Sequence, residues 1–114
     1  MKATVVKVTS DSIIFDGGQT LSSEHRSACC EHHYLSFEHL TEKDFEGMTF
    51  DLEGDFFEKV DGYGIRLKPI SGGHPVSVPG YGYNNGYYST ELTLVLTEGR
   101  NYKKFDITEC QVIK

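Results

Sequence analysis

Three of the five histidines and two of the three cysteines fall within nine residues of one another. The string runs His25-Arg26-Ser27-Ala28-Cys29-Cys30-Glu31-His32-His33. Imidazole and thiolate are ligands that Zn²⁺ prefers, so the string could hold a metal ion through His25, Cys30 and His32, or through His33 in place of His32. A thiolate beside an imidazole is also the arrangement of a cysteine nucleophile.

The spacing of this string argues against a metal site. Structural zinc sites place their ligands in pairs about two to four residues apart, with the second pair about a dozen residues away or more. Adjacent side chains of a strand point to opposite faces. One face would carry Cys29, Glu31 and His33, and the other would carry Cys30 and His32. We therefore expect no bound metal and no other cofactor.

Nucleophilic catalysis would pair Cys29 with His33, or Cys30 with His25, and Glu31 could orient the base. The chain contains no signature of a thiol hydrolase family. In the simpler interpretation, one cysteine packs in the core as a small apolar residue, the other lies near the surface, and the histidines form local hydrogen bonds. We expect the simpler interpretation.

A second string, residues 79–90, is rich in tyrosine, glycine and asparagine. Asn85-Gly86 fits a type I′ turn, because both central residues of that turn need a positive φ. The turn predicts a hairpin in which Tyr81 pairs with Thr90. Tyrosine with Gly, Asn and Ser is also typical of binding surfaces, because tyrosine offers a rigid contact area with a polar tip. The candidate binding residues lie around the turn: Asn85, Tyr87, Tyr88 and Ser89.

The order of the two strings resembles a family of small uncharacterised proteins of bacteria and their phages. In that family a histidine precedes a Cys-Cys-Glu triplet, and an Asn-Gly-Tyr-Tyr-Ser string follows further along the chain. The matching residues are His25, Cys29-Cys30-Glu31 and Asn85-Gly86-Tyr87-Tyr88-Ser89. The family has no assigned activity, so the resemblance implies an origin but no chemistry. It also suggests that the two strings lie close together and form one surface.

The net charge is −6, and the acidic residues gather in one segment. Residues 38–61 hold nine acidic residues and only two lysines. Clustered Lys and Arg are what bind phosphates, so we expect no nucleic-acid partner. We interpret the acidic segment as a solvated face, and the alternative is a negative surface for a basic protein partner.

The length of 114 residues predicts a single domain, residues 1–114. No apolar run exceeds about five residues, so no membrane-spanning helix is expected, and the N-terminus lacks the layout of a signal peptide. Three cysteines make an odd count. We therefore expect reduced thiols and a cytoplasmic location, not a disulfide framework.

β-Branched and aromatic residues dominate the chain and favour strands. Their alternation predicts strands at 3–9, 13–15, 19–24, 30–37, 62–70, 76–78, 92–97 and 102–107. A short helix is expected near residues 41–47, with Thr41 as its N-cap. The C-terminal apolar side chains should share one buried face: Leu92, Leu94, Leu96, Phe105 and Ile107. The predicted fold is mainly β, one antiparallel sheet of about six to eight strands, curled or partly closed, with the helix against it.

These features favour a non-enzymatic accessory or interaction domain that binds a protein through the tyrosine string or the acidic segment. The alternative is a small thiol-dependent enzyme or metal-binding protein that uses His25, Cys29, Cys30 and His33. An enzyme needs a concave pocket with a cysteine and a histidine within hydrogen-bond reach, whereas a binding domain presents an exposed patch.

Overall fold

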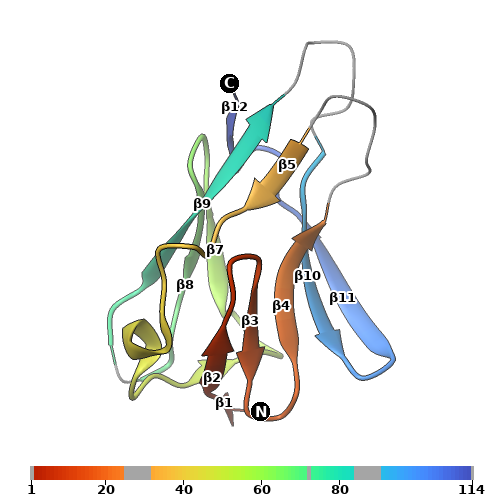
Figure 1. Ribbon diagram of the computed structural model, residues 1–114. Helices are drawn as coiled ribbons and strands as arrows, with labels where there is room; N and C mark the ends of the chain where they lie inside the picture. The colour runs from red at the N-terminus through yellow and green to blue at the C-terminus, as the bar shows by residue number, and fades with distance from the viewer. Residues whose placement is uncertain (1, 25–31, 72, 84–90, 114) are drawn as a thin grey trace.

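The computed structural model describes residues 2–24, 32–71, 73–83 and 91–113. Over these residues the chain is built from short β-strands and one turn of 3-10 helix, η1 (Figure 1). The mainly β class is therefore confirmed. The described part of the chain contains no helix long and apolar enough to cross a membrane.

The strands and η1 follow in the order β1 (Lys2–Ala3), β2 (Val5–Val8), β3 (Ser12–Phe15), β4 (Thr20–Glu24), β5 (His32–Leu35), η1 (Glu42–Phe45), β6 (Phe50–Asp51), β7 (Phe57–Val60), β8 (Gly64–Leu67), β9 (Val76–Tyr83), β10 (Thr93–Glu98), β11 (Asn101–Asp106) and β12 (Val112–Ile113). One five-stranded sheet has the order β11-β10-β4-β3-β2. The other has the order β12-β9-β8-β7, with β5 also paired to β9, and β1 pairs separately with β6. The described pairs are antiparallel apart from β12 with β9.

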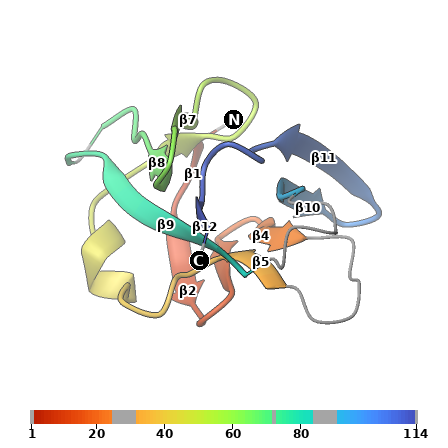
Figure 2. The same cartoon turned by 90° about the horizontal axis from the view of Figure 1, so that it is seen from above.

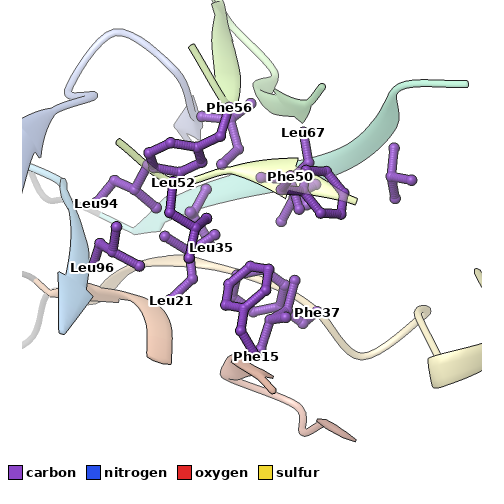
Figure 3. Close-up of a cluster of buried hydrophobic side chains, with 14 of the residues drawn as sticks. Phe15, Leu21, Leu35, Phe37, Phe50, Leu52, Phe56, Leu67, Leu94 and Leu96 are labelled. Atoms are coloured by element: carbon purple, nitrogen blue, oxygen red, sulfur yellow. The ribbon is translucent and has the colours of Figure 1, made fainter. Parts of the chain in front are cut away.

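The two larger sheets share one hydrophobic core. Figures 1 and 2 show the sheets as separate layers, and Figure 3 shows their side chains meeting between the layers. Both sheets contribute side chains that are at most 1% exposed, including Ile13, Leu21 and Leu94 from the first and Leu35, Ile65 and Val78 from the second. The ring of Phe50 from β6 lies 6.1 Å from that of Phe15 and 6.2 Å from that of Phe45. Strand alternation thus buries one face of each sheet against the other.

The prediction of one curled or partly closed sheet is wrong. β5 follows β4 in the chain but pairs with β9, from His32↔Tyr83 to Leu35↔Gly80. The chain therefore leaves the first sheet after β4 and enters the second. Each open sheet covers the apolar face of the other, so neither has to close on itself. Apolar alternation is the same in one layer and in two facing layers, which is why it suggested a single sheet.

The helix predicted near residues 41–47 is also wrong. Glu42–Phe45 form a single 3-10 turn, in which the backbone N–H of Glu46 donates to the carbonyl of Lys43 at 3.2 Å. Glu46 then adopts φ −59° and ψ 128°, which ends the turn. Phe45 is buried and anchors the turn to the core. One turn is enough to seat that ring, and short 3-10 pieces are the usual connectors of this kind.

The C-terminal hairpin is predicted correctly. Glu98 pairs with Asn101 across a two-residue loop, and Gly99 supplies the positive φ (61°) that such loops need. The expected buried face is formed: Leu92, Leu94, Leu96 and Ile107 are at most 5% exposed, and Phe105 packs against the core. The strands β6, β7 and β12 were not predicted.

β9 has different neighbours along its length. Residues Val76–Pro79 pair with β8, and the second half pairs with β5 on one side and with β12 on the other. Tyr81 pairs with Tyr34 and Val112. Thr90, its expected partner, lies outside the described residues. The turn predicted at Asn85-Gly86 lies outside the described residues.

Gly80 sits at this junction, and a Cβ built there would lie 2.3 Å from the carbonyl oxygen of Cys110. Because that atom belongs to the backbone, Gly80→Ala must push the chain before β12 away from β9. We expect the substitution to lower the free energy of unfolding by about 2–3 kcal/mol. Urea denaturation of the two proteins measures this difference.

The matched control is Gly99→Asn, in the open β10–β11 turn, where a Cβ meets no atom within 4 Å. Asn tolerates a positive φ, so this change should stay within about 0.5 kcal/mol. If Gly80→Ala is as stable as the control, the close approach at Gly80 is not a packing constraint.

Candidate functional site

The structure places only part of the predicted site residues. His25, Cys29, Cys30 and Glu31 lie outside the described residues, as do the binding candidates Asn85, Tyr87, Tyr88 and Ser89. The hypotheses that these residues bind metal, act in catalysis or contact a partner stay predictions. His32 and His33 both lie in β5.

His33 is 4% exposed and is part of a buried polar chain. Its Nδ1 lies 2.7 Å from Oε1 of Gln111, whose Nε2 donates to the carbonyl of Thr108 at 2.8 Å. This orientation of the amide makes His33 Nδ1–H the donor. The hydrogen bonds connect β5 to the chain that leads into β12. The described contacts of His33 thus join two strands of the second sheet.

Described residues at the ends of the two strings are neighbours in the sheets. Glu24, the last residue before the first string, pairs with Thr93, which follows the second string. His32, near the end of the first string, pairs with Tyr83, within the second. The chain on either side of residues 25–31 is therefore paired with the chain on either side of residues 84–90. This arrangement agrees with the hypothesis that the strings form one surface, which remains a prediction.

The described residues form an open groove on the outer face of the second sheet. We call it the tyrosine groove; its volume is about 490 Å³, and it is lined by Tyr34, Ser36, Glu38, His39, Tyr63, Pro79 and Tyr81. These residues come from β5 and the loop after it, from the turn between β7 and β8, and from β9. Segments distant in sequence thus meet at one place.

Strand alternation explains why this face carries the groove. Leu35 and Phe37 are at most 1% exposed and point into the core. Their neighbours Tyr34, Ser36 and Glu38 therefore point to the opposite face. Pro79 and Tyr81 have the same two-residue spacing on β9, and Tyr81 is the register partner of Tyr34.

The aromatic rings of the groove lie close together and remain accessible. The ring centroids of Tyr34 and Tyr81 are 5.9 Å apart, with an angle of 47° between the ring planes. Tyr34 is 40% exposed and Tyr63 is 39% exposed. The backbone carbonyl of Tyr63 accepts a hydrogen bond of 2.7 Å from Gly80, which fixes the turn beside β9. The groove therefore offers rigid aromatic surface to solvent.

Glu38 gives the groove an acidic group. It is exposed, and no lysine or arginine among the described residues forms an ion pair with it. Two basic side chains of the same sheet are held by other carboxylates: Arg66 by Glu58 at 3.2 Å, and Lys59 by Glu109 at 3.0 Å. A cation at the groove would therefore meet an uncompensated carboxylate.

Several acids of the segment 38–61 have local structural contacts. Glu42 accepts a hydrogen bond of 2.7 Å from the backbone N–H of Val8 and so covers part of the edge of β2. Asp44 accepts one of 2.8 Å from the backbone N–H of Thr41 at the start of η1. Asp55 pairs with Lys68. The high density of acids in this segment thus partly reflects capping and local pairing.

A second cluster contains Asp61, Glu109 and Cys110, whose possible ligand atoms lie within 4.8 Å of one another. Burial, and then the charge of Glu109, raise the pKa of the Cys110 thiol. A hydrogen bond and the charge of Glu109 raise the pKa of Lys59, which holds that carboxylate. Both effects oppose binding of a metal ion, because metal ligands must be deprotonated and a lysine already occupies one carboxylate.

A smaller hollow of about 210 Å³ lies between the β10–β11 hairpin and the turn after β6. Leu52 and Leu96 contribute its apolar surface, and Tyr102 and Lys103 form part of its wall. Tyr102 is 63% exposed. This hollow combines one exposed aromatic ring with flexible charged side chains, so we regard the tyrosine groove as the stronger candidate site.

Sequence reasoning did not select the residues of the tyrosine groove as a site. The available signal was the alternation of Tyr34, Ser36 and Glu38 with buried Leu35 and Phe37, which separates the two faces of one strand. No local sequence pattern indicated that Tyr63 would line the groove, because its position depends on the pairing of β8 with β9.

Comparison of the chain with protein-family models, with curated proteins and with solved structures finds no match. The resemblance to small bacterial and phage proteins therefore stays a prediction.

Asp106 supports the turn that places Gln111 beside His33. Its Oδ1 accepts hydrogen bonds from the hydroxyl (2.6 Å) and backbone N–H (3.1 Å) of Thr108, and these bonds lower the pKa of Asp106. A lowered pKa in the folded state means that the charged form stabilises the fold above the ordinary aspartate range. This contribution is lost as the pH falls through the folded-state pKa.

We therefore expect Asp106→Asn to be less stable than the wild type at pH 7, and the difference to shrink as the pH falls below about 4. Urea unfolding between pH 7 and pH 3 measures both curves. Glu46→Gln, an exposed change in the acidic segment, is the matched control. A stability difference for Asp106→Asn that stays constant across this range would contradict the proposed role of its charge.

Proposed function

We propose that this protein is a non-enzymatic interaction domain that binds another protein through the tyrosine groove. The observation that carries the proposal is that Tyr34, Tyr63 and Tyr81, from three separate segments, line one open groove. Tyrosine gives a large contact area at a low cost in conformational entropy, and it is enriched where proteins bind one another.

The charge of the chain supports a protein as the partner. A net charge of −6 and an acidic groove repel phosphate groups. Aromatic rings can also stack on nucleic-acid bases, but such surfaces combine the rings with a basic channel. Glu38 stands where that channel would need a lysine or an arginine. The proposal therefore does not include nucleic acid.

A thiol-dependent enzyme or a metal-binding protein has less support from the described residues. Of the three cysteines, only Cys110 lies in the described part of the chain. Its side chain is 0% exposed and forms no hydrogen bond to a described histidine. A cysteine nucleophile needs an exposed thiol of lowered pKa, whereas burial raises the pKa of Cys110. The alternative rests on His25, Cys29 and Cys30, which lie outside the described residues.

We also propose that the protein is located in the cytoplasm and that it originates from bacteria or their phages. The odd cysteine count supports the location. The paired strings around Cys29-Cys30-Glu31 and Asn85-Gly86 support the origin through the family that they resemble.

Photo-crosslinking tests the groove as a protein interface. Tyr63 is replaced by benzoylphenylalanine, an aromatic residue of similar shape, and the protein is irradiated in the cells that encode it. We expect one discrete adduct, and we expect Tyr34→Ala with Tyr81→Ala to reduce its yield by roughly tenfold or more, because truncating aromatic anchors removes most of the binding energy.

Tyr102→Ala, which removes a more exposed tyrosine on the other sheet, is the control and should leave the yield unchanged. A thermal melt confirms that each variant is folded. An adduct that persists in the Tyr34 and Tyr81 variant, or that disappears in the Tyr102 variant, would overturn the groove as the interface. So would the lack of any adduct.

A further inference from the structure

We propose that the tyrosine groove takes an extended, proline-rich peptide segment that carries a basic residue. This inference rests on the proposed function, because it specifies the chemistry of the protein segment that the groove would bind. The floor of the groove, the groups at its rim and its charge all fit such a segment.

The floor of the groove is the face of a paired ladder. Tyr34 is already paired with Tyr81, and β9 is flanked at this point by β5 and β12. The backbone between Tyr34 and Tyr81 is therefore already paired. A peptide that lies over these two residues gains its contacts from the side-chain face of the ladder.

Aromatic side chains dominate that face. Tyr34 and Tyr81 lie with their rings tilted by 47°, and Tyr63 and Pro79 complete the apolar lining. A polyproline II segment is recognised in this way, with its ring faces packed on tyrosines in an aromatic-lined groove. It has no internal hydrogen bonds, and proline has no N–H to leave unpaired when it is buried.

The polar groups of the groove also suit such a segment. The hydroxyl groups of Tyr63 and Ser36 line the groove and can donate to the backbone carbonyls that a polyproline II segment leaves free. His39 is held in place by a contact of 3.3 Å between its Nε2 and the carbonyl of Ser77. The segment is stiff before it binds, so a shallow groove loses less affinity to ordering.

The charge of Glu38 favours a basic residue in the bound peptide. Glu38 lines the groove and forms no ion pair with a described lysine or arginine. Arg66 and Lys59, in the same sheet, are occupied by Glu58 and Glu109. An arginine of the peptide would therefore be attracted to Glu38, whereas an acidic peptide would be repelled.

The test is an NMR titration of the full-length ¹⁵N-labelled protein with synthetic peptides of about twelve residues. The main peptide has proline at most positions and one arginine at each end, so that either binding direction is served. A second peptide replaces the prolines with serine, and a third replaces the arginines with norleucine. We expect saturable shifts of the amides of Tyr34, Ser36, Tyr63 and Tyr81 with the main peptide.

The variants make the expectation specific. Tyr34→Ala should weaken binding of the main peptide by roughly tenfold or more, and Tyr102→Ala should not change it. Glu38→Gln should weaken binding of the main peptide by roughly two- to fivefold but leave the norleucine peptide unaffected, because the pair with Glu38 is exposed. The Tyr34→Ala spectrum shows whether that variant is folded.

The inference is overturned if no peptide gives saturable shifts, if the serine peptide binds as tightly as the proline peptide, or if Glu38→Gln has no effect. It is also overturned if shifts map to the β10–β11 hairpin instead of the groove. If the crosslinked adduct at position 63 forms while the proline peptides fail to bind, the interaction domain stands and only this inference falls. If both fail, the proposed function falls with it.

Discussion

The close approach of three backbone segments at Gly80 is the constraint on which the second sheet depends. At this residue β9 changes its neighbour on one edge from β8 to β12, while β5 pairs with it along the other edge. The carbonyl of Cys110 lies where a side chain at position 80 would be, and the N–H of Gly80 donates to the carbonyl of Tyr63. A larger residue would separate β9 from β12 and would disturb the turn that carries Tyr63.

The tyrosine groove follows from the same constraint. The hydrogen bond from Gly80 places Tyr63 beside β9, and the antiparallel register of β5 sets Tyr34 directly across from Tyr81. None of these side chains reaches the groove through a long loop. Since each is fixed by a strand or by a turn bound to a strand, the rings are organised before any partner arrives, which lowers the entropic cost of binding.

The sequence was informative where structure is local and less so where it depends on distant pairing. Alternation at Leu92, Leu94 and Leu96 predicted a buried face, and Glu98-Gly99-Arg100-Asn101 predicted a hairpin turn, because both signals lie within about ten residues. No local sequence pattern predicts that the chain changes sheet between β4 and β5, since the residues His32–Leu35 could equally pair with β4. Short strands such as Phe50–Asp51 depend wholly on their partners. The helix near residues 41–47 was predicted from capping residues, but burial of Phe45 needs only one turn.

The predicted site had the same difficulty. Strings rich in His, Cys and Tyr drew attention because chemistry-bearing residues are adjacent in sequence, whereas the groove collects single residues from three segments. β5 shows both outcomes side by side. His33 faces inward and is tied to Gln111, and Tyr34, the next residue, faces outward into the groove. Alternation therefore separates the two tasks of this strand: the inward side chains hold the sheets together, and the outward ones remain available for a partner. Changes at Tyr34 or Glu38 can alter binding while the core formed by Leu35 and Phe37 stays intact.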